Sequence, residues 1–193
     1  VIPDILRLIQ KAEQEGYDGA VIGCYYDPGL YDARGLANNM VVTAPQEASV
    51  HIAATMGHQF SIIAVDDLCI PQISRTVAMY GLKDKLASIK TLGMEVHALH
   101  KDPDFTIQRI IEKGREAVEK DFAEVLILGC TVQIGYYKKV QEELGVPVID
   151  PVIAAFKYVE MLAELKREFG WMHSKKYGFQ SPPASEMQEW QLL

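Results

Sequence analysis

The sequence has few cysteines, no long apolar run and no excess of positive charge. Three cysteines in 193 residues do not fit the disulfide framework of a secreted protein, so we expect reduced thiols and a cytoplasmic location. The net charge of −7 argues against nucleic acid or an anionic membrane surface as a partner. No apolar run reaches the roughly 18 residues of a transmembrane helix, and the first residues lack the regions of a signal peptide.

Short apolar, β-branched segments alternate along the chain with segments of helical spacing. Strands are expected at 19–24, 39–44, 60–65, 87–99 with a break at Gly93, 124–129 and 146–150, and helices at 2–15, 30–36, 45–56, 71–80, 105–120, 136–144 and 152–168. Asp104 is the expected N-cap of the helix over 105–120, and residues 174–193 are expected to be a surface extension. Strands without polar alternation, separated by helices, indicate an α/β protein whose parallel sheets are covered on both faces.

Two of the three cysteines stand in the same local context, 106 residues apart. Cys24 and Cys130 each follow an apolar strand and a glycine, and each precedes a proline, Pro45 or Pro151, by 21 residues. The repeat indicates two related, pseudo-symmetric α/β halves.

The first half is predicted to comprise residues 1–58 plus 152–193, and the second half residues 59–151. Seventy residues separate Phe60 from Cys130, but only 23 precede Cys24. If the halves are equivalent, the first therefore lacks about 47 residues, the length of one strand–helix–strand unit.

Both cysteines are expected at the carboxyl ends of strands, where open α/β sheets bind ligands. Two thiols on opposite faces of one carbon could invert that carbon, one removing a proton as thiolate and the other delivering a proton. Because both cysteines precede predicted helices, we expect the helix N-termini to lower the thiol pKa values. A cysteine is often only a small buried hydrophobe, and Cys69, which has no partner in the repeat, is assigned a structural role.

The sequence resembles the aspartate/glutamate/hydantoin racemase superfamily, and most closely its hydantoin (allantoin) racemase branch. The stretches that carry the resemblance are Cys24 with DPGL (27–30), EAS (47–49), LGCT (128–131), VPVID (146–150) and SK (174–175). The resemblance implies a racemase that needs neither cofactor nor metal, has Cys24 and Cys130 as catalytic residues, acts on a small molecule and forms a homo-oligomer.

Three departures from the pattern of the branch concern the expected substrate-binding residues. Tyr25-Tyr26 replace the usual Phe-Gly, Val132-Gln133 replace small residues after Thr131, and Asp66-Asp67 replace a Thr-Thr pair after Val65. The resemblance assigns substrate contacts to five of these positions: Tyr25, Asp66, Asp67, Thr131 and Val132. The two aspartates would repel a substrate carboxylate.

We predict an isomerase that inverts a carbon next to a carbonyl, with a hydantoin-type ring as substrate and the enolate stabilised by backbone amides of the Gly-Cys turns. An amino-acid racemase, a maleate-type isomerase and a decarboxylase are alternatives, as is a non-catalytic ligand-binding protein on the same scaffold. His97 and His100 are three residues apart, but no nearby cysteine or carboxylate set completes a zinc site. No glycine-rich cofactor motif is present.

Overall fold

The computed structural model describes residues 1–189, and its contacts divide the chain into two compact units. Among the described residues, the first unit comprises Val1–Ile22, Asp27–Ala44 and residues 156–189, and the second comprises Gly23–Tyr26 and Pro45–Ala155. The halves expected from the repeat put residues 45–56 with the first half, whereas packing puts them with the second unit. The repeat itself stays a prediction.

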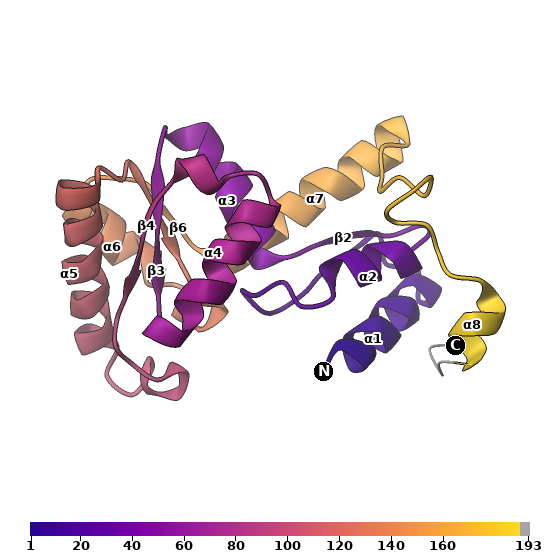
Figure 1. Ribbon diagram of the computed structural model, residues 1–193, viewed down its shortest axis with the longest axis horizontal. Helices are drawn as coiled ribbons and strands as arrows, with labels where there is room; N and C mark the ends of the chain where they lie inside the picture. Colours follow the sequence, from indigo (N-terminus) through magenta and orange to yellow (C-terminus); the bar gives the residue numbers. More distant parts are fainter. Residues whose placement is uncertain (190–193) are drawn as a thin grey trace. The chain divides into compact units, whose positions relative to one another are not determined.

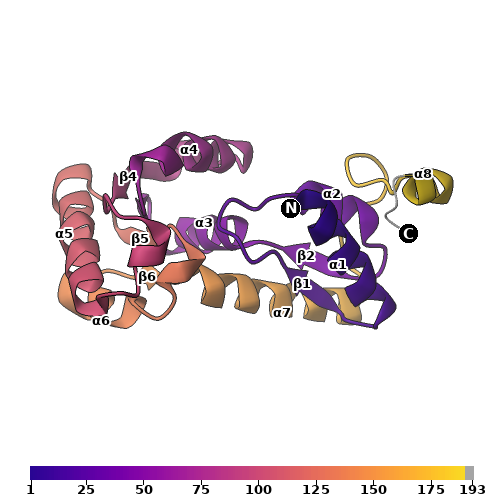
Figure 2. The same cartoon turned by 90° about the horizontal axis from the view of Figure 1, so that it is seen from below.

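The first unit is built on a two-stranded parallel sheet. Its elements are α1 (Ile2–Gln14), β1 (Gly19–Val21), α2 (Leu30–Leu36), β2 (Val41–Thr43), the C-terminal part of α7 (Pro151–Phe169) and α8 (Ala184–Glu189). Ala20 of β1 pairs with Val42 of β2. Figure 2 shows α7 on one side of this sheet and α1 and α2 on the other. A Cβ atom at Gly19 would lie 2.6 Å from Cγ2 of Val159, so the close contact between β1 and α7 requires glycine there.

The second unit is built on a four-stranded parallel sheet with the order β4-β3-β5-β6. Its elements are α3 (Pro45–Met56), β3 (Phe60–Ala64), α4 (Ile70–Met79), β4 (Leu86–Thr91), α5 (Pro103–Asp121), β5 (Val125–Leu128), α6 (Tyr137–Leu144) and β6 (Val148–Ile149). Figure 1 shows α5 and α6 on one side of the sheet and α3 and α4 on the other. Every residue of β3 and β5 is buried, as expected for central strands covered on both faces. The predicted α/β class is confirmed.

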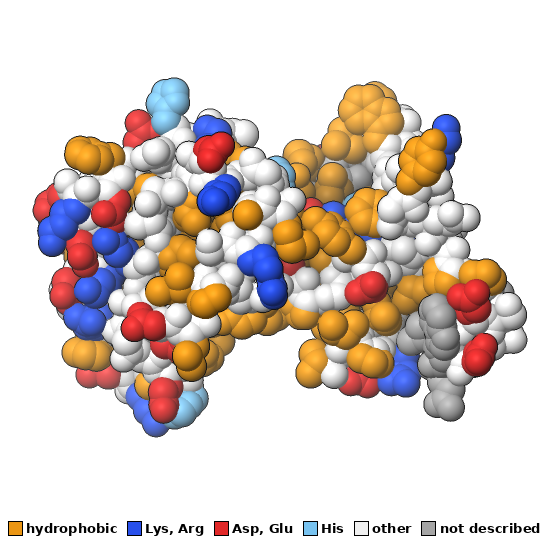
Figure 3. All heavy atoms as spheres, viewed as in Figure 1, with side chains coloured by type: hydrophobic (Ala, Val, Ile, Leu, Met, Phe, Trp, Pro, Cys, Tyr) orange, Lys and Arg blue, Asp and Glu red, His pale blue; other side chains and the backbone are white. Residues whose placement is uncertain are grey.

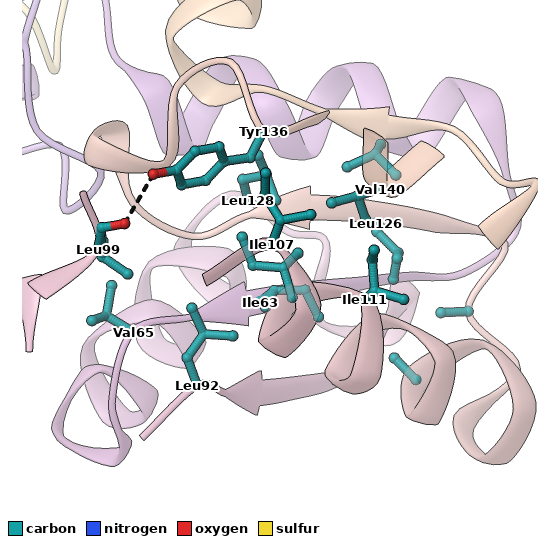
Figure 4. Packing of buried hydrophobic residues seen from close by; sticks show 14 residues of the cluster. Ile63, Val65, Leu92, Leu99, Ile107, Ile111, Leu126, Leu128, Tyr136 and Val140 are labelled. Atoms are coloured by element: carbon teal, nitrogen blue, oxygen red, sulfur yellow. Dashed lines mark hydrogen bonds between the residues drawn. The ribbon is translucent and has the colours of Figure 1, made fainter. Parts of the chain in front are cut away.

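The core between this sheet and α5 fixes the strand ends that carry the candidate site. Figure 4 shows Ile63 of β3 and Leu126 and Leu128 of β5 packed with Ile107 and Ile111 of α5. Each such side chain contributes about 1.5–3 kcal/mol when fully buried. The carboxyl ends of β3 and β5 are therefore held side by side on a rigid support.

Two features near the helix ends differ from the expectations. Asp102, not Asp104, is the N-cap of α5: its carboxylate accepts a hydrogen bond of 3.0 Å from the Phe105 amide, and the helix begins at Pro103. The C-terminal extension contains a short helix, α8. The expectation of Asp104 as N-cap is wrong, because the proline at the first helical position moves the start of the helix two residues back.

The exposed face of α5 is a mixture of positive and negative side chains, which Figure 3 shows as intermingled blue and red spheres. The ion pairs there include Lys113 with Glu116 and Arg109 with Glu112. This pattern is typical of a solvated helix face. In the described part of the chain, no helix is both long and apolar enough to cross a membrane.

Candidate active site

Cys130 lies at the carboxyl end of the central strand β5. The close packing of β5 against β3 requires a glycine directly before it. Gly129 precedes it, and its amide donates to the carbonyl of Ile63 over 2.8 Å. A Cβ atom at Gly129 would lie 2.9 Å from that same carbonyl oxygen, so only glycine lets β5 approach β3 this closely. The Gly129 amide is therefore committed to the sheet, and does not support the expectation that it stabilises an enolate.

Cys24 lies in the segment that links β1 to α2, and this segment packs with the second unit. Residues Gly23–Tyr26 belong to that unit, although the chain on both sides of them belongs to the first. The hydroxyl of Thr131 lies 3.5 Å from the carbonyl oxygen of Gly23. The residue before Cys24 thus contacts the residue after Cys130, and the two cysteines are brought into one neighbourhood.

The two thiols are half-buried and close enough to interact electrostatically. Burial is the main reason why the pKa of Cys130 is raised, and the charges of Cys24 and Cys69 raise it further. The backbone amide of Val132 donates to the Cys130 sulfur and partly opposes this rise. For Cys130 the expected lowering of the pKa by a helix N-terminus is therefore wrong, because burial outweighs one amide. Cys130 is a thiol at neutral pH.

Cys69 belongs to the same neighbourhood, although its place in the sequence predicted only a structural role. It lies in the 3-10 turn η1 (Asp67–Cys69), directly after β3. Its S–H donates to Oδ1 of Asp66 over 3.6 Å, and negative charge on this sulfur, when ionised, is one of the causes that raise the pKa of Cys130. Because β3 and β5 are adjacent parallel strands, a cysteine five residues after Ala64 could have been placed at the same sheet edge as Cys130.

Tyr26 reaches this cluster, whereas its neighbour Tyr25 is almost fully buried, with 3% of its surface exposed. Burial, a hydrogen bond with Cys69 and the charges of Cys69, Asp66 and Cys24 hold the pKa of the Tyr26 phenol above its usual range. Tyr26 is a neutral phenol at physiological pH, and 37% of the residue remains exposed. The feature of the sequence that pointed to Tyr26 was the Tyr25-Tyr26 pair, which replaces the usual Phe-Gly.

The two aspartates after β3 have different partners. Asp66 is half-buried and caps η1, accepting from the Leu68 amide over 2.8 Å. Asp67 is exposed, and its carboxylate accepts from the hydroxyl of Thr91 at the end of β4. Of the two, Asp66 is thus the one whose charge acts on a residue beside the thiols.

Gln133 ends the turn that Cys130 begins. Its side chain is 0% exposed, and neither its Nε2 nor its Oε1 atom has a hydrogen-bond partner among residues 1–189. A buried amide without partners destabilises a protein. In the sequence, Gln133 was distinguished only by standing where the branch usually has a small residue.

The thiol cluster is not arranged as a metal site in the described residues. All three cysteines are free thiols, and residues 1–189 contain no group of three or more His, Cys, Asp or Glu side chains placed to hold a metal ion. His97 pairs with Glu95, and His100 contacts the Tyr136 hydroxyl at 2.8 Å. The chemistry that the cluster offers is proton transfer by thiols next to a neutral phenol and a carboxylate.

A parallel α/β fold with two interacting thiols at strand ends is suited to proton transfer. Comparison with known proteins identifies the family to which such a fold and site belong. The family Asp/Glu/hydantoin racemase matches residues 1–159. A hydantoin racemase of a Pseudomonas species (strain NS671) is 35% identical over 91% of this chain and 70% of its own length. That of Paenarthrobacter aurescens is 34% identical over 92% of this chain and 74% of its own length.

Among solved structures, allantoin racemase from Klebsiella pneumoniae matches with a TM-score of 0.87 and 30% identity, over 94% of this chain and 72% of that one. This chain therefore belongs to the Asp/Glu/hydantoin racemase family. It is an enzyme of the racemase class, an isomerase. The resemblance noted in the sequence, including its hydantoin and allantoin branch, is confirmed.

Proposed function

We propose that this protein racemises a hydantoin-type ring at the carbon next to a ring carbonyl, with Cys24 and Cys130 as the two acid/base groups. The observation that supports the proposal is the contact of 3.5 Å between the Thr131 hydroxyl and the Gly23 carbonyl oxygen, which joins the residue after Cys130 to the residue before Cys24 although 106 residues separate the two cysteines. The names of the relatives, hydantoin racemase and allantoin racemase, support the substrate class.

The raised pKa of Cys130 gives the proposed reaction an order. Cys130 begins as a thiol, since its pKa is raised, and it is the proton donor. Cys24, as thiolate, removes the proton from the carbon, and the electron pair moves into the adjacent carbonyl to give an enolate. Cys130 then transfers its proton to the opposite face of the same carbon. Both cysteines end in the opposite protonation state, and the reverse reaction starts from there.

The substrate contacts of this proposal come from the residues around the thiols. Thr131 and Val132 follow Cys130, and Asp66 and Asp67 follow the neighbouring strand β3. We include all four, with Tyr25, as substrate-binding residues. A carbon next to a ring carbonyl is acidic enough for the enolate to hold the electron pair, so the proposed mechanism uses no cofactor and no metal.

The cytoplasmic location and the homo-oligomeric state predicted from the sequence are further parts of the proposal. Three free thiols agree with a reducing compartment. Size-exclusion chromatography with light scattering would measure the oligomeric state directly, and a monomer at micromolar concentration would contradict that part.

Polarimetry tests the proposed function. The full chain is incubated separately with single enantiomers of a 5-substituted hydantoin, of allantoin and of free amino acids, and the loss of optical rotation is corrected for the uncatalysed rate. We expect loss of rotation with one or more of the ring substrates and no change with the amino acids. Loss of rotation with amino acids alone would favour an amino-acid racemase. No change with any of them, together with tight ligand binding, would favour a non-catalytic binding protein.

A further inference from the structure

Asp150 is a buried carboxylate at the carboxyl end of β6, with 4% of its surface exposed. Its Oδ1 atom accepts from the amides of Val152 and Ile153 over 3.0 and 3.4 Å, in the first turn of α7. Its Oδ2 atom accepts from the amide of Gly135 over 2.7 Å. One carboxylate therefore joins the beginning of α7 to the loop that follows Cys130.

The two oxygens of Asp150 serve different parts of the chain. Asp150 precedes Pro151, the first residue of α7, and the side chain of an N-cap residue normally accepts from the second or third amide of its helix. Capping uses one oxygen, and asparagine caps a helix about as well as aspartate does. The start of α7 therefore explains the contacts of Oδ1, whereas the hydrogen bond from Gly135 to Oδ2 belongs to the loop.

The loop that Asp150 holds is the turn that begins with Cys130. Before this turn, the Gly129 amide donates into β3 over 2.8 Å. Inside it, the Gln133 amide donates to the carbonyl oxygen of Cys130 over 3.0 Å. At its end, Gly135 has a φ of 87°, a left-handed conformation that favours glycine. The turn is thus fixed at its first end by the sheet and at its second end by Asp150.

The other proposed acid/base group is held in a different way. Cys24 lies on a segment that contacts the turn through the Thr131 hydroxyl, 3.5 Å from the carbonyl oxygen of Gly23. This distance is longer than an ordinary O–H···O hydrogen bond, whereas the hydrogen bond that Asp150 accepts from the turn is 2.7 Å long. A change at Asp150 should therefore displace Cys130 more than Cys24.

We infer that Asp150 is a positioning residue of the racemase reaction, which holds the turn in the conformation that presents the Cys130 thiol to one face of the substrate carbon. The inference rests on the proposed function, in which each thiol serves one face, and adds a residue that supports one face alone. Asp150 acts through the backbone of the turn and not by contact with the reacting carbon. A displacement of about 1 Å can lower a rate about 10²-fold, so loss of this hydrogen bond should be measurable.

The experiment introduces Asp150→Asn into two variants of the full chain, Cys24→Ala and Cys130→Ala. Asparagine keeps one oxygen for the cap of α7 and replaces the other with an NH₂ group, which cannot accept from Gly135. Proton NMR in heavy water measures exchange at the ring carbon of each enantiomer of 5-benzylhydantoin, corrected for the uncatalysed rate. We expect Asp150→Asn to slow exchange about 10- to 100-fold in Cys24→Ala, where Cys130 is the remaining base, and less than about twofold in Cys130→Ala.

Two further variants complete the comparison. Asp102→Asn makes the same change at the N-cap of α5, where the carboxylate accepts from the Phe105 amide over 3.0 Å, and should leave both exchange rates unchanged. Asp150→Ser supplies a single oxygen for the cap of α7 and should act like Asp150→Asn. If Asp150→Asn does not fold, the two exchange rates in Asp150→Ser decide the matter.

The outcomes separate this inference from the proposed function. If the wild type does not racemise a hydantoin and neither cysteine variant exchanges a proton, the proposed function fails and the inference fails with it. If the cysteine variants exchange opposite enantiomers, the proposed function stands, and an equal effect of Asp150→Asn on both, or none on either, overturns the inference alone. An equal loss would show a general structural role, because a general loss of structure does not distinguish the two faces of the carbon.

Discussion

Burial and the charges of two neighbouring sulfurs act on the Cys130 thiol in the same direction. Because its pKa is raised, we expect iodoacetamide to alkylate Cys130 more slowly at pH 7 than it alkylates the same cysteine in the denatured chain. The half-maximal rate should lie at a pH above about 8.5, the ordinary thiol value. Mass spectrometry of the Cys130 peptide across a pH series measures this.

The raised pKa of Cys130 also affects the stability of the folded protein, and two variants can test its cause. The folded protein holds the Cys130 proton more tightly than the unfolded chain does, so this contribution to stability is complete below the unfolded pKa and is lost as pH rises through the folded one. Cys24→Ala and Cys69→Ala each remove a sulfur whose negative charge, when ionised, raises the pKa of Cys130. Both should shift the alkylation profile of Cys130 to lower pH, and an unchanged profile in both variants would contradict the shared neighbourhood.

Gln133 is a second residue with a testable energetic consequence. Its amide is buried without a hydrogen-bond partner among residues 1–189. Gln133→Met keeps the length of the side chain and removes the polar group, so we expect the free energy of unfolding to rise by about 1–2 kcal/mol. Urea denaturation measures it. The exposed Gln108→Met change on α5 is the control and should have little effect, and a loss of stability in Gln133→Met would show that the amide has a partner.

At the residue scale, the sequence located the two repeated cysteines but missed the groups that contact them. Cys24 and Cys130 could be found because a repeated Gly-Cys after an apolar run is a local pattern. Cys69 could not be found in this way, since its position depends on β3 and β5 being neighbours in the sheet. The Tyr26–Cys69 contact joins segments about 40 residues apart, and no spacing rule predicts such a contact.

At the scale of elements, the sequence predicted most strands and helices because their burial leaves a clear composition, but the strand expected over 87–99 ends at Thr91, and Val96–Ala98 forms a 3-10 turn. The run Phe60–Ala64, apolar except for Ser61, and the apolar run Val125–Leu128 reflect burial on both faces of the sheet. The beginning of α5 was predicted wrongly. A proline disfavours helical backbone at the residue before it. Asp102, which precedes Pro103, therefore remains outside the helix and caps it.

This difference between two aspartates can be measured. Asp102→Ala removes the acceptor for the Phe105 amide, so we expect a loss of about 1 kcal/mol in the free energy of unfolding. Asp104→Ala removes only an exposed ion pair with Lys139, and should change stability by much less. Thermal or urea unfolding of both variants makes the comparison. Equal losses would mean that the two side chains contribute alike to the start of α5.

At the scale of the whole molecule, the sequence predicted the α/β class but not which segments pack together. The first unit has a two-stranded sheet and the second a four-stranded sheet. Residues 23–26 leave the first unit to pack with the second, and this exchange puts Cys24 near Cys130. Packing of a four-residue loop depends on side-chain contacts with distant segments, which neither periodicity nor turn signals encode.

Because the two thiols come from different parts of the chain, each can be removed while the other stays in place. We expect Cys24→Ala and Cys130→Ala each to lower racemisation by at least the ~10²–10⁴-fold that a positioned acid or base supplies. In heavy water, however, each variant should still exchange the proton of one enantiomer, because the remaining cysteine faces one side of the carbon. The two variants should exchange opposite enantiomers, which proton NMR of each pure enantiomer detects.

The pH dependence of the exchange rate provides a second test. In Cys24→Ala the remaining base is Cys130, which is a thiol at neutral pH, so its exchange rate should increase as pH rises toward the thiol pKa. Cys69→Ala retains both proposed bases and is the control that should still racemise. Exchange of the same enantiomer by both variants would contradict the assignment of one thiol to each face. Full activity in both variants would mean that the cysteines are structural, and a different base would have to be sought among the groups around Asp66 and Tyr26.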